Sequence, residues 1–323
     1  MIKSRQRGII KLDFSEKKSI RGAIGEELAE LGKVNPNIVV LDADLSGSTK
    51  TSIFAKAFPD RFFNVGIAEQ NLITTALGLS LTGKIPFAAT FAMFATGRTY
   101  DQIRNSVCYQ NANVKIIGAH GGITVGEDGA SHQALEDVAL MRCIPNMMVI
   151  APADYEQAKK VVKFAVEYNG PVYIRSSRVD VPCIFNSDCE FSPDKAVILK
   201  EGKDISVFVT GDISSEVLKA DDILSAQGLE AEIINVPVIK PLDCGTIINS
   251  VKKTNCAVVV ENHSVIGGLG SAIAECLSEK FPSKVVRIGV NDTFGQSGTP
   301  ADLLQFYGLD AKSIAKRIIE LKK

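Results

Sequence analysis

Short apolar segments alternate with segments of helical periodicity along the whole chain, and this alternation limits the folds that are possible. The predicted strands are residues 37–41, 62–65, 85–90, 114–119, 147–151, 172–175, 205–210, 231–236, 257–260 and 285–288. The predicted helices are residues 15–33, 52–57, 67–81, 92–110, 135–141, 154–167, 214–227, 243–253, 271–280 and 310–322. Strands separated by helices form βαβ units, so the sequence predicts an α/β fold with mostly parallel sheets.

A change of composition at residues 181–203 divides this alternation in two. The segment contains Pro182, Asn186, Asp188 and Pro193 and few periodic apolar positions, which favours a linker with a short hairpin. We therefore expect two α/β domains, residues 1–190 and a smaller domain of residues 191–323.

Composition and charge exclude several classes of protein. The 323 residues are 46% hydrophobic and 23% charged, as in ordinary globular proteins, and the net charge of −1 gives no reason to expect binding to nucleic acid or an anionic membrane. No apolar run is long enough to cross a bilayer, and no apolar signal segment follows the basic residues 1–14. The seven cysteines have no CxxC spacing, which favours free thiols in the cytoplasm.

Residues 62–94, FFNVGIAEQNLITTALGLSLTGKIPFAATFAMF, combine a helical run with one acid. The run is apolar on nearly every face, a pattern typical of a buried helix, yet Glu69 lies in its first turn. A buried carboxylate must find a hydrogen-bond partner or take up a proton, and such groups are often catalytic. A structural role at the positive end of the helix dipole is the alternative, and both remain open.

Residues 118–133, GAHGGITVGEDGASHQ, form a glycine-rich polar loop that contains two of the three histidines. His120 and His132 flank Glu127 and Asp128, and the loop follows a predicted strand, where open parallel sheets bind ligands. Imidazole transfers protons near neutral pH, so the pair favours a functional site. A metal site is the rival hypothesis, although it needs a third ligand, and hydrogen bonding within the loop is the structural alternative for Asp128.

Three motifs together resemble transketolase. They are GIAEQN (residues 66–71), TFAMF (residues 90–94) and GEDGASHQ (residues 126–133). The resemblance covers the pyrimidine-binding and C-terminal domains of that family, and the chain is similar to the separate C-terminal subunit of split transketolases. It implies thiamine diphosphate-dependent transfer of a two-carbon ketol unit between sugar phosphates. A deoxyxylulose-phosphate synthase-like subunit, a 2-oxo acid dehydrogenase β chain and a non-catalytic assembly subunit remain alternatives.

The resemblance implies roles for the residues that would face the cofactor. Glu69 would bind N1′ of the thiamine aminopyrimidine and so favour the tautomer that takes the proton from the reactive carbon. Phe91 would stack on the pyrimidine with Phe94 nearby. Asp44 matches a position near the thiazolium, although an N-cap is its structural alternative.

The resemblance also implies the residues that would bind sugar phosphates. His120, His132 and Asp128 match positions that contact substrate. The acceptor phosphate would be held by three further residues, Arg21, Ser48 and Arg178; the arginine fork suits a phosphate because it donates two parallel hydrogen bonds.

Three positions, in two of the motif regions, depart from the transketolase pattern. Gly97 stands where full-length transketolases carry an aromatic residue, and Ala130–Ser131 replaces Pro-Thr. Similarity to the synthase relatives implies a substrate contact for Arg98.

The chain lacks the GDG motif with which this family holds Mg²⁺ and the cofactor diphosphate. We therefore expect no metal ligands from this chain and an N-terminal partner subunit that supplies them, in an α2β2 assembly built on a homodimer of this chain.

Residues 236–243 and 261–270 are similar to transketolase C-terminal domains. Gly268 and Gly270 lack the third glycine of a dinucleotide-binding turn, so we expect a tight structural turn there and a structural role for His263.

Overall fold

The computed structural model describes residues 14–321. Residues 1–13, which hold nearly all of the basic N-terminal segment, and residues 322–323, at the end of the last predicted helix, lie outside the described part. None of the helices in residues 14–321 is both long enough and apolar enough to cross a membrane.

The first sheet has seven strands in the order β12-β6-β7-β5-β4-β2-β3. The strands are β2 (Ile38–Asp42), β3 (Phe62–Asn64), β4 (Ile85–Phe91), β5 (Lys115–Ala119), β6 (Met148–Ile150), β7 (Val172–Arg175) and β12 (Val238–Lys240). All neighbours are parallel except β12, which pairs antiparallel with β6. The central strands are buried on both faces, which explains why they are continuous apolar runs in the sequence.

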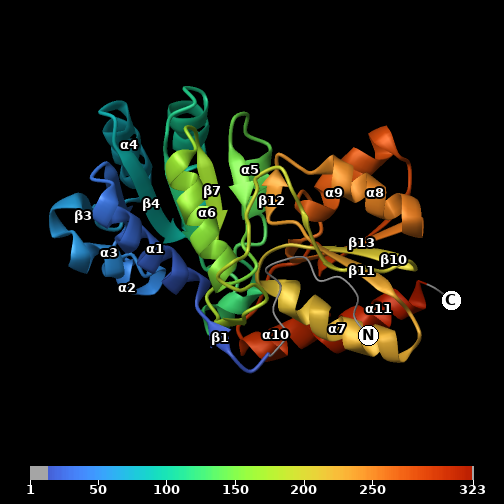
Figure 1. The fold of residues 1–323 in the computed structure, drawn as a ribbon. Coiled ribbons are helices and arrows are strands. Elements are labelled where there is room, and N and C mark those ends of the chain that lie inside the picture. Colours follow the sequence, from blue (N-terminus) through green and yellow to red (C-terminus); the bar gives the residue numbers. More distant parts are fainter. Residues whose placement is uncertain (1–13, 322–323) are drawn as a thin grey trace.

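Helices cover both faces of this sheet (Figure 1). One face packs against α1 (Ile20–Val34), α3 (Ser52–Ala57) and α6 (Tyr155–Glu167). The other face packs against α4 (Glu69–Leu81), the π-helical turn η3 (Gln102–Cys108) and α5 (Asp137–Arg142). Ser19 caps α1 by accepting from Gly22, and Asp154 caps α6 by accepting from Gln157.

The second sheet has five strands in the order β14-β13-β10-β11-β9. The strands are β9 (Val197–Lys200), β10 (Ile205–Val209), β11 (Ala231–Asn235), β13 (Cys256–Ser264) and β14 (Lys284–Val290). Only β9 is antiparallel to its neighbour. In Figure 1, α8 (Cys244–Thr254) and α9 (Leu269–Lys280) lie above this sheet, and α7 (Ser214–Ala226), α10 (Pro300–Phe306) and α11 (Ala311–Glu320) lie below it.

The two domains share a hydrophobic core. Buried residues of α4 and α5 in the first domain belong to the same cluster as Phe208, Ile234 and Ile273 of the second. The strand β12 also comes from the second half of the chain but joins the first sheet. The predicted two-domain α/β fold is confirmed, whereas the boundary near residue 190 stays a prediction.

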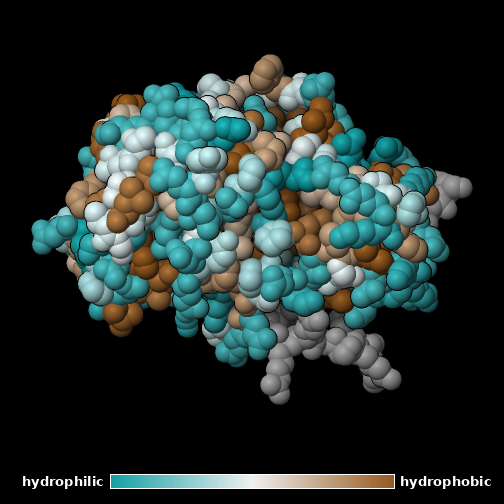
Figure 2. All heavy atoms as spheres, turned by 90° about the horizontal axis from the view of Figure 1, so that it is seen from above, coloured by the Kyte–Doolittle hydropathy of each residue, from teal (hydrophilic) through white to brown (hydrophobic). Residues whose placement is uncertain are grey.

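The helix α4 is not buried as the sequence predicted. Leu72, Ile73 and Ala76 form a buried stripe, but Leu81 is 68% exposed, and Ile67, just before the helix, is 78% exposed. One face of α4 meets the sheet, and within residues 14–321 nothing covers Ile67 and Leu81 on its outer side. Figure 2 shows hydrophobic residues reaching the surface at several separate places on the face seen there.

Two further predictions of secondary structure are wrong. The single regular helix expected at residues 92–110 is instead interrupted at Thr99 and contains the π-helical turns η2 (Phe94–Arg98) and η3. The hydroxyls of Thr96 and Thr99 bond to the carbonyls of Ala92 and Ala95 in the first of these segments. The expected hairpin is absent from residues 181–203, where β8 (Val181–Pro182) pairs with β1 (Lys17–Lys18) and β9 pairs with β11.

Candidate functional site

The candidate site lies at the carboxyl edge of the first sheet. The strands β2, β4, β5 and β7 are parallel, so the residues that end or follow them meet at this edge. Phe91 ends β4, His120 follows β5 and Arg178 follows β7. The helix α1 precedes β2 and places Arg21 in its first turn at the same edge, where it bonds to Ser48 and Arg178.

Glu69 is buried but opens onto a recess. It is the first residue of α4 and is 5% exposed, and its Oε1 accepts a hydrogen bond from Nη1 of Arg98 at 2.8 Å. The recess, of about 410 Å³, is lined by residues 67–71 and Arg98. The buried carboxylate thus has a hydrogen-bond partner, and its negative charge also stabilises the positive N-terminal end of the α4 dipole. A catalytic role and a structural role for Glu69 are therefore compatible.

Four rings pack together beside this acid. The ring centroids of Phe91 and Phe94 lie 5.8 Å apart in a stacked arrangement, and those of Phe91 and His120 lie 3.9 Å apart. His132 meets Phe94 edge-on at 5.3 Å. The guanidinium of Arg98 lies 4.0 Å from the centre of the Phe94 ring and so joins the aromatic group to Glu69.

His120 is held as a neutral imidazole. It is 3% exposed, and its Nδ1 has no hydrogen-bond partner within the described part of the chain. Burial first, and then the nearby charges of Arg21, Arg178 and His132, together lower the pKa of His120 to about 3. His120 can therefore exchange hydrogen bonds with a polar ligand at neutral pH, but it carries no positive charge there.

Arg21, Ser48 and Arg178 come together as the resemblance implies. Arg21 donates to the main-chain carbonyls of Ser48 and Arg178, and Arg178 donates to the carbonyl of Val125. Arg178 also lies 3.6 Å from the carboxylate of Asp128. Burial and the charge of Arg178 lower the pKa of Arg21, so an anion bound here would relieve the repulsion between the two guanidinium groups.

Asp44 does not cap a helix, so its structural alternative is wrong. The following helix α2 (Ser46–Thr49) has no side-chain cap, and Oδ1 of Asp44 accepts instead from Asn64 at 2.9 Å.

The residue that orders this turn is Asp42, which the sequence analysis did not single out. Asp42 accepts from the Leu45 amide and from two threonine hydroxyls, and so fixes the segment that carries Ser48. An acid ending an apolar strand was the signal available for finding it.

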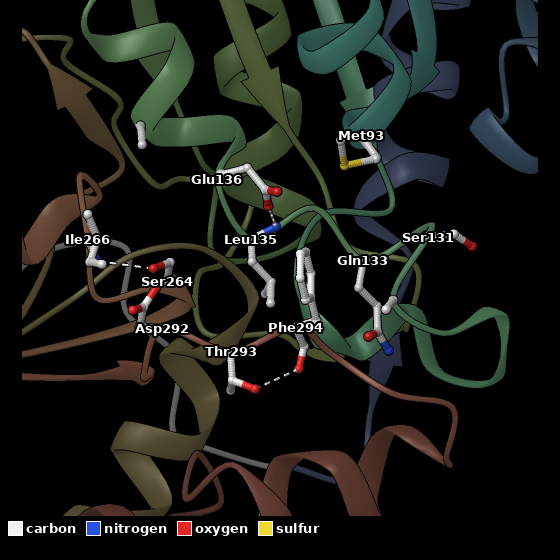
Figure 3. Close-up of a pocket in the computed structure, with 12 residues that line it drawn as sticks. Met93, Ser131, Gln133, Leu135, Glu136, Ser264, Ile266, Asp292, Thr293 and Phe294 are labelled. Carbon is white, nitrogen blue, oxygen red and sulfur yellow. Dashed lines mark hydrogen bonds between the residues drawn. The ribbon is translucent and has the colours of Figure 1, made fainter.

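A second hollow, of about 530 Å³, opens where the two domains meet. Figure 3 shows Met93 and Ser131 on one side and Asp292 and Phe294 on the other. Its described lining includes Glu136 and Asp292 but no lysine or arginine. A sugar phosphate therefore fits the arginine pair better than this hollow.

Within residues 14–321, no group of three potential metal ligands assembles. The hypothesis of a metal site in the glycine-rich loop therefore finds no third ligand there for His120 and His132.

Comparison with known protein families covers both domains. Residues 16–182 match the model described as transketolase, pyrimidine binding domain, and residues 194–314 match transketolase, C-terminal domain. The chain belongs to the transketolase family. The resemblance noted in the sequence is thereby confirmed.

Individual transketolase relatives are similar over nearly their whole length. A putative transketolase C-terminal section from Methanocaldococcus jannaschii is 53% identical, and the alignment covers 95% of this chain and 97% of the relative. A 6-deoxy-6-sulfo-D-fructose transketolase subunit from Clostridium sp. is 41% identical, with 94% of each chain covered. A solved structure described as a split gene transketolase, inactive beta4 tetramer, is 53% identical with a TM-score of 0.88 and covers 94% of this chain and 97% of that one. This chain therefore corresponds to the C-terminal section of a split transketolase.

Proposed function

We propose that this chain is the C-terminal subunit of a two-subunit, thiamine diphosphate-dependent transketolase that moves a two-carbon ketol unit between sugar phosphates. The observation that carries the proposal is the buried Glu69 carboxylate, which opens onto a recess beside the stacked rings of Phe91 and Phe94. The names of the similar transketolase sections and subunits support the same activity.

The described residues fit the aminopyrimidine half of the cofactor. The recess beside Glu69 has the size of a small-molecule site, and Arg98, which lines it, lies over the ring of Phe94 and so connects the recess to the aromatic group. Thiamine diphosphate, when bound, supplies the nucleophilic carbon that carries the ketol unit. Glu69 would share a proton with N1′ of the pyrimidine, which requires Arg98 to give up or share its bond to that carboxylate.

The arginine pair and the two histidines would bind the substrate. Arg21 and Arg178 would hold the phosphate of the acceptor, with Ser48 at the same edge. The neutral His120, with its unpartnered Nδ1, would bond to a sugar hydroxyl, and His132 and Asp128 would bond to others. Arg98, half-exposed at the mouth of the recess, would meet the substrate after leaving Glu69. Asp44 would face the thiazolium side of the cofactor.

A partner subunit would complete the site. We infer that an N-terminal subunit supplies the ligands for Mg²⁺ and the diphosphate, because this sequence lacks the GDG motif. The relative solved as an inactive beta4 tetramer supports the need for a partner. The uncovered apolar residues Ile67 and Leu81 suit a homodimer of this chain within an α2β2 assembly. The seven free cysteines suit the cytoplasm.

The test is reconstitution with the candidate N-terminal subunit. We expect the two chains to co-purify and to convert xylulose 5-phosphate and ribose 5-phosphate in a coupled assay, with no turnover by either chain alone. Parallel assays with pyruvate plus glyceraldehyde 3-phosphate, and with 2-oxo acids, test the synthase and dehydrogenase alternatives. Turnover only in those assays, or no turnover by a stable complex, would contradict the proposal.

A further inference from the structure

Asn262 of the C-terminal domain bonds to the middle of the glycine-rich loop of the candidate site. This residue lies in β13, is 1% exposed and belongs to the second sheet. Its Oδ1 accepts from the backbone amide of Ile123 at 2.9 Å, and its Nδ2 donates to Oγ1 of Thr124 at 3.1 Å. Ile123 and Thr124 lie midway between His120 and Asp128. The amide of Asn262 therefore binds the middle of the loop whose two ends carry candidate site residues.

Asp212 of the same domain completes this contact. It follows β10, and its Oδ2 accepts from Nδ2 of Asn262 at 3.0 Å and from Oγ1 of Thr124 at 2.9 Å. Both N–H groups of the Asn262 amide and its oxygen are thus used. Since all three side chains are buried, each lost bond would leave a polar group without water to replace it.

The loop backbone is closely packed against Asn262 at Gly122. Gly122 has φ of +84°, and a Cβ added there would lie 2.4 Å from the side-chain atoms of Asn262. The loop therefore packs directly on the amide, and its position is set by where Asn262 stands.

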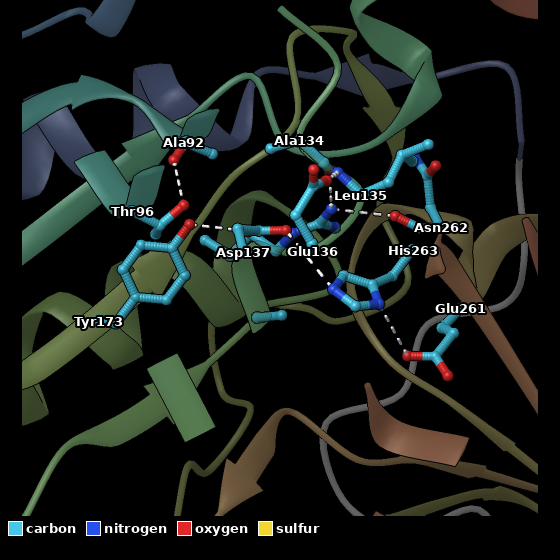
Figure 4. A network of polar contacts seen from close by, with 12 residues as sticks. Ala92, Thr96, Ala134, Leu135, Glu136, Asp137, Tyr173, Glu261, Asn262 and His263 are labelled. Carbon is cyan, nitrogen blue, oxygen red and sulfur yellow. Dashed lines mark hydrogen bonds and ion pairs between the residues drawn. The ribbon is translucent and has the colours of Figure 1, made fainter. Parts of the chain in front are cut away.

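A second polar network fixes the end of the loop (Figure 4). The guanidinium of Arg175 donates to Oδ2 of Asp137 at 2.7 Å, to the Ala134 carbonyl and to the main-chain carbonyl of Asn262 at 2.9 Å. Gln133 donates to the carbonyl of Gln296 in the C-terminal domain. The C-terminal domain thus holds the loop both in its middle and where it ends.

We propose that Asn262 is a positioning residue, through which the C-terminal domain sets the places of His120, Asp128 and Arg178 at the substrate side of the site. The link to Arg178 runs through its bond to the Val125 carbonyl, one residue beyond Thr124. This inference rests on the proposed transketolase function. It gives the C-terminal domain a role in substrate binding.

The variant Asn262→Asp tests the proposal because it keeps the shape of the side chain. It removes both donated bonds and sets a second carboxylate against Asp212, so the loop must move away from its present position. We expect the KM for the acceptor sugar phosphate to rise and kcat to fall, with a loss in kcat/KM of about tenfold to a hundredfold. Binding of thiamine diphosphate to the reconstituted complex should change little, because Glu69, Phe91 and Phe94 lie outside this loop.

The exchanged pair Asn262→Asp/Asp212→Asn is the rescue. In it the carboxylate at position 262 still accepts from the Ile123 amide and now also accepts from the Thr124 hydroxyl and from the new amide at position 212, which donates to Thr124 as well. The bond to Ile123 is therefore kept, and the three bonds among the side chains at positions 262, 124 and 212 are restored with their direction reversed. We expect kcat/KM to return to within about threefold of the wild-type value, a margin small beside the tenfold effects of misplaced groups. Asn249→Asp, the same change at an exposed position of α8, is the matched control and should match the wild type.

Hydrogen exchange of the isolated chain gives a readout that does not depend on turnover. In Asn262→Asp the amides of residues 120–128 should exchange faster while the strands of both sheets stay protected, and the exchanged pair should reverse this. Thr124→Val, which removes the hydroxyl from the loop side, should have the same effect to a smaller degree and serves if Asn262→Asp does not fold.

The possible outcomes are distinct. Wild-type exchange and kinetics in a folded Asn262→Asp variant would overturn the positioning role. So would loss of protection from exchange throughout the chain, with no rescue by the exchanged pair. If no form of the complex has transketolase activity, the proposed function fails, and the exchange of residues 120–128 still decides whether Asn262 positions the loop.

Discussion

At the scale of single residues, the Glu69 carboxylate has one strong partner, the Arg98 guanidinium at 2.8 Å. Glu69→Ala should remove turnover in the reconstituted complex, by about a hundredfold or more, because no other acid lines the recess. Stability should change by only about 0–1 kcal/mol, because the Arg98 side chain is 52% exposed and finds water instead. The coupled assay and thermal unfolding measure the two effects. Glu30→Ala, on the exposed face of α1, is the control, and normal activity in Glu69→Ala would refute the assigned role.

His120 makes stability depend on pH at the scale of one residue. Its pKa is lowered to about 3 by burial and by the charges of Arg21, Arg178 and His132, whereas in the unfolded chain it titrates near its ordinary value of 6.5. Between these values the unfolded state binds more protons, so this contribution to stability is complete above about pH 6.5 and is lost as the pH falls toward 3.

His120→Gln removes that titration. The difference in unfolding free energy between the variant and the wild type should therefore move in favour of the variant as the pH falls from 7.5 to 4.5. Urea unfolding at several pH values in this interval measures it. A difference that stays constant with pH would show that His120 is not held neutral.

Sequence motifs identified residues that contact the site directly, but they did not identify residues that act on the site through other residues. Glu69 and Phe91 stand in sequence motifs and His120 in the glycine-rich loop, so their chemistry is visible in the sequence. Arg178 stands in no motif and was assigned only by the resemblance to transketolase. Asn262 acts across 139 residues of sequence, through a bond to the backbone of Ile123, and neither residue type is distinctive. Asp42 orders the segment that carries Ser48 by accepting hydrogen bonds from the hydroxyls of Thr49 and Thr51. These contacts, and so the role of Asp42, are seen in the structure and not in the sequence.

At the scale of elements, Lys115 joins β5 to the turn after α6. It is fully buried and donates to the carbonyls of Tyr168 and Gly170 at 2.7 and 2.6 Å. Burial lowers the pKa of Lys115 to about 7, below its ordinary value of 10.5. Between these values the unfolded state binds more protons, so the unfolding free energy gains a contribution that rises with pH.

Lys115→Met should abolish this rise between about pH 7 and 10, since methionine has no proton to lose. It should also lower stability by about 1–3 kcal/mol at pH 9, because two buried carbonyls lose their donor. Urea unfolding across this pH range measures both effects, with Lys56→Met on the exposed side of α3 as the control. A variant that retains the wild-type pH slope would contradict the prediction.

Element boundaries were predictable where local signals and packing agree. The helix α3 and the strand β7 have the predicted bounds, since apolar runs there end at turn residues. The strand β12 escaped prediction because its three residues are ordered by pairing with β6, not by their own pattern. The helix α10 was missed although Thr299 and Pro300 form a recognisable start signal.

At the scale of the whole molecule, the alternation of strands and helices sufficed for the fold, because each βαβ unit follows from local periodicity. What covers a surface does not follow from periodicity. The apolar outer face of α4 suggested burial from the sequence, yet Leu72, Ile73 and Ala76 are buried whereas Leu81 is exposed to solvent in the described part of the chain. The failure of that prediction locates a face that the proposed α2β2 assembly would cover.

The same incompleteness applies to the cofactor site and gives the last prediction. This chain offers Glu69 and aromatic faces for the pyrimidine, but its sequence lacks the GDG motif that would hold Mg²⁺ and the diphosphate. The diphosphate carries most of the charge of the cofactor. A site without the Mg²⁺ that binds the diphosphate therefore lacks the strongest electrostatic interactions with the cofactor. Calorimetry of the lone chain with Mg²⁺ and thiamine diphosphate should therefore show weak or no binding, whereas addition of the N-terminal subunit should produce Mg²⁺-dependent binding. Tight binding to the lone chain would contradict this division of the site, and loss of Mg²⁺ dependence in the complex would place the metal outside the partner's contribution.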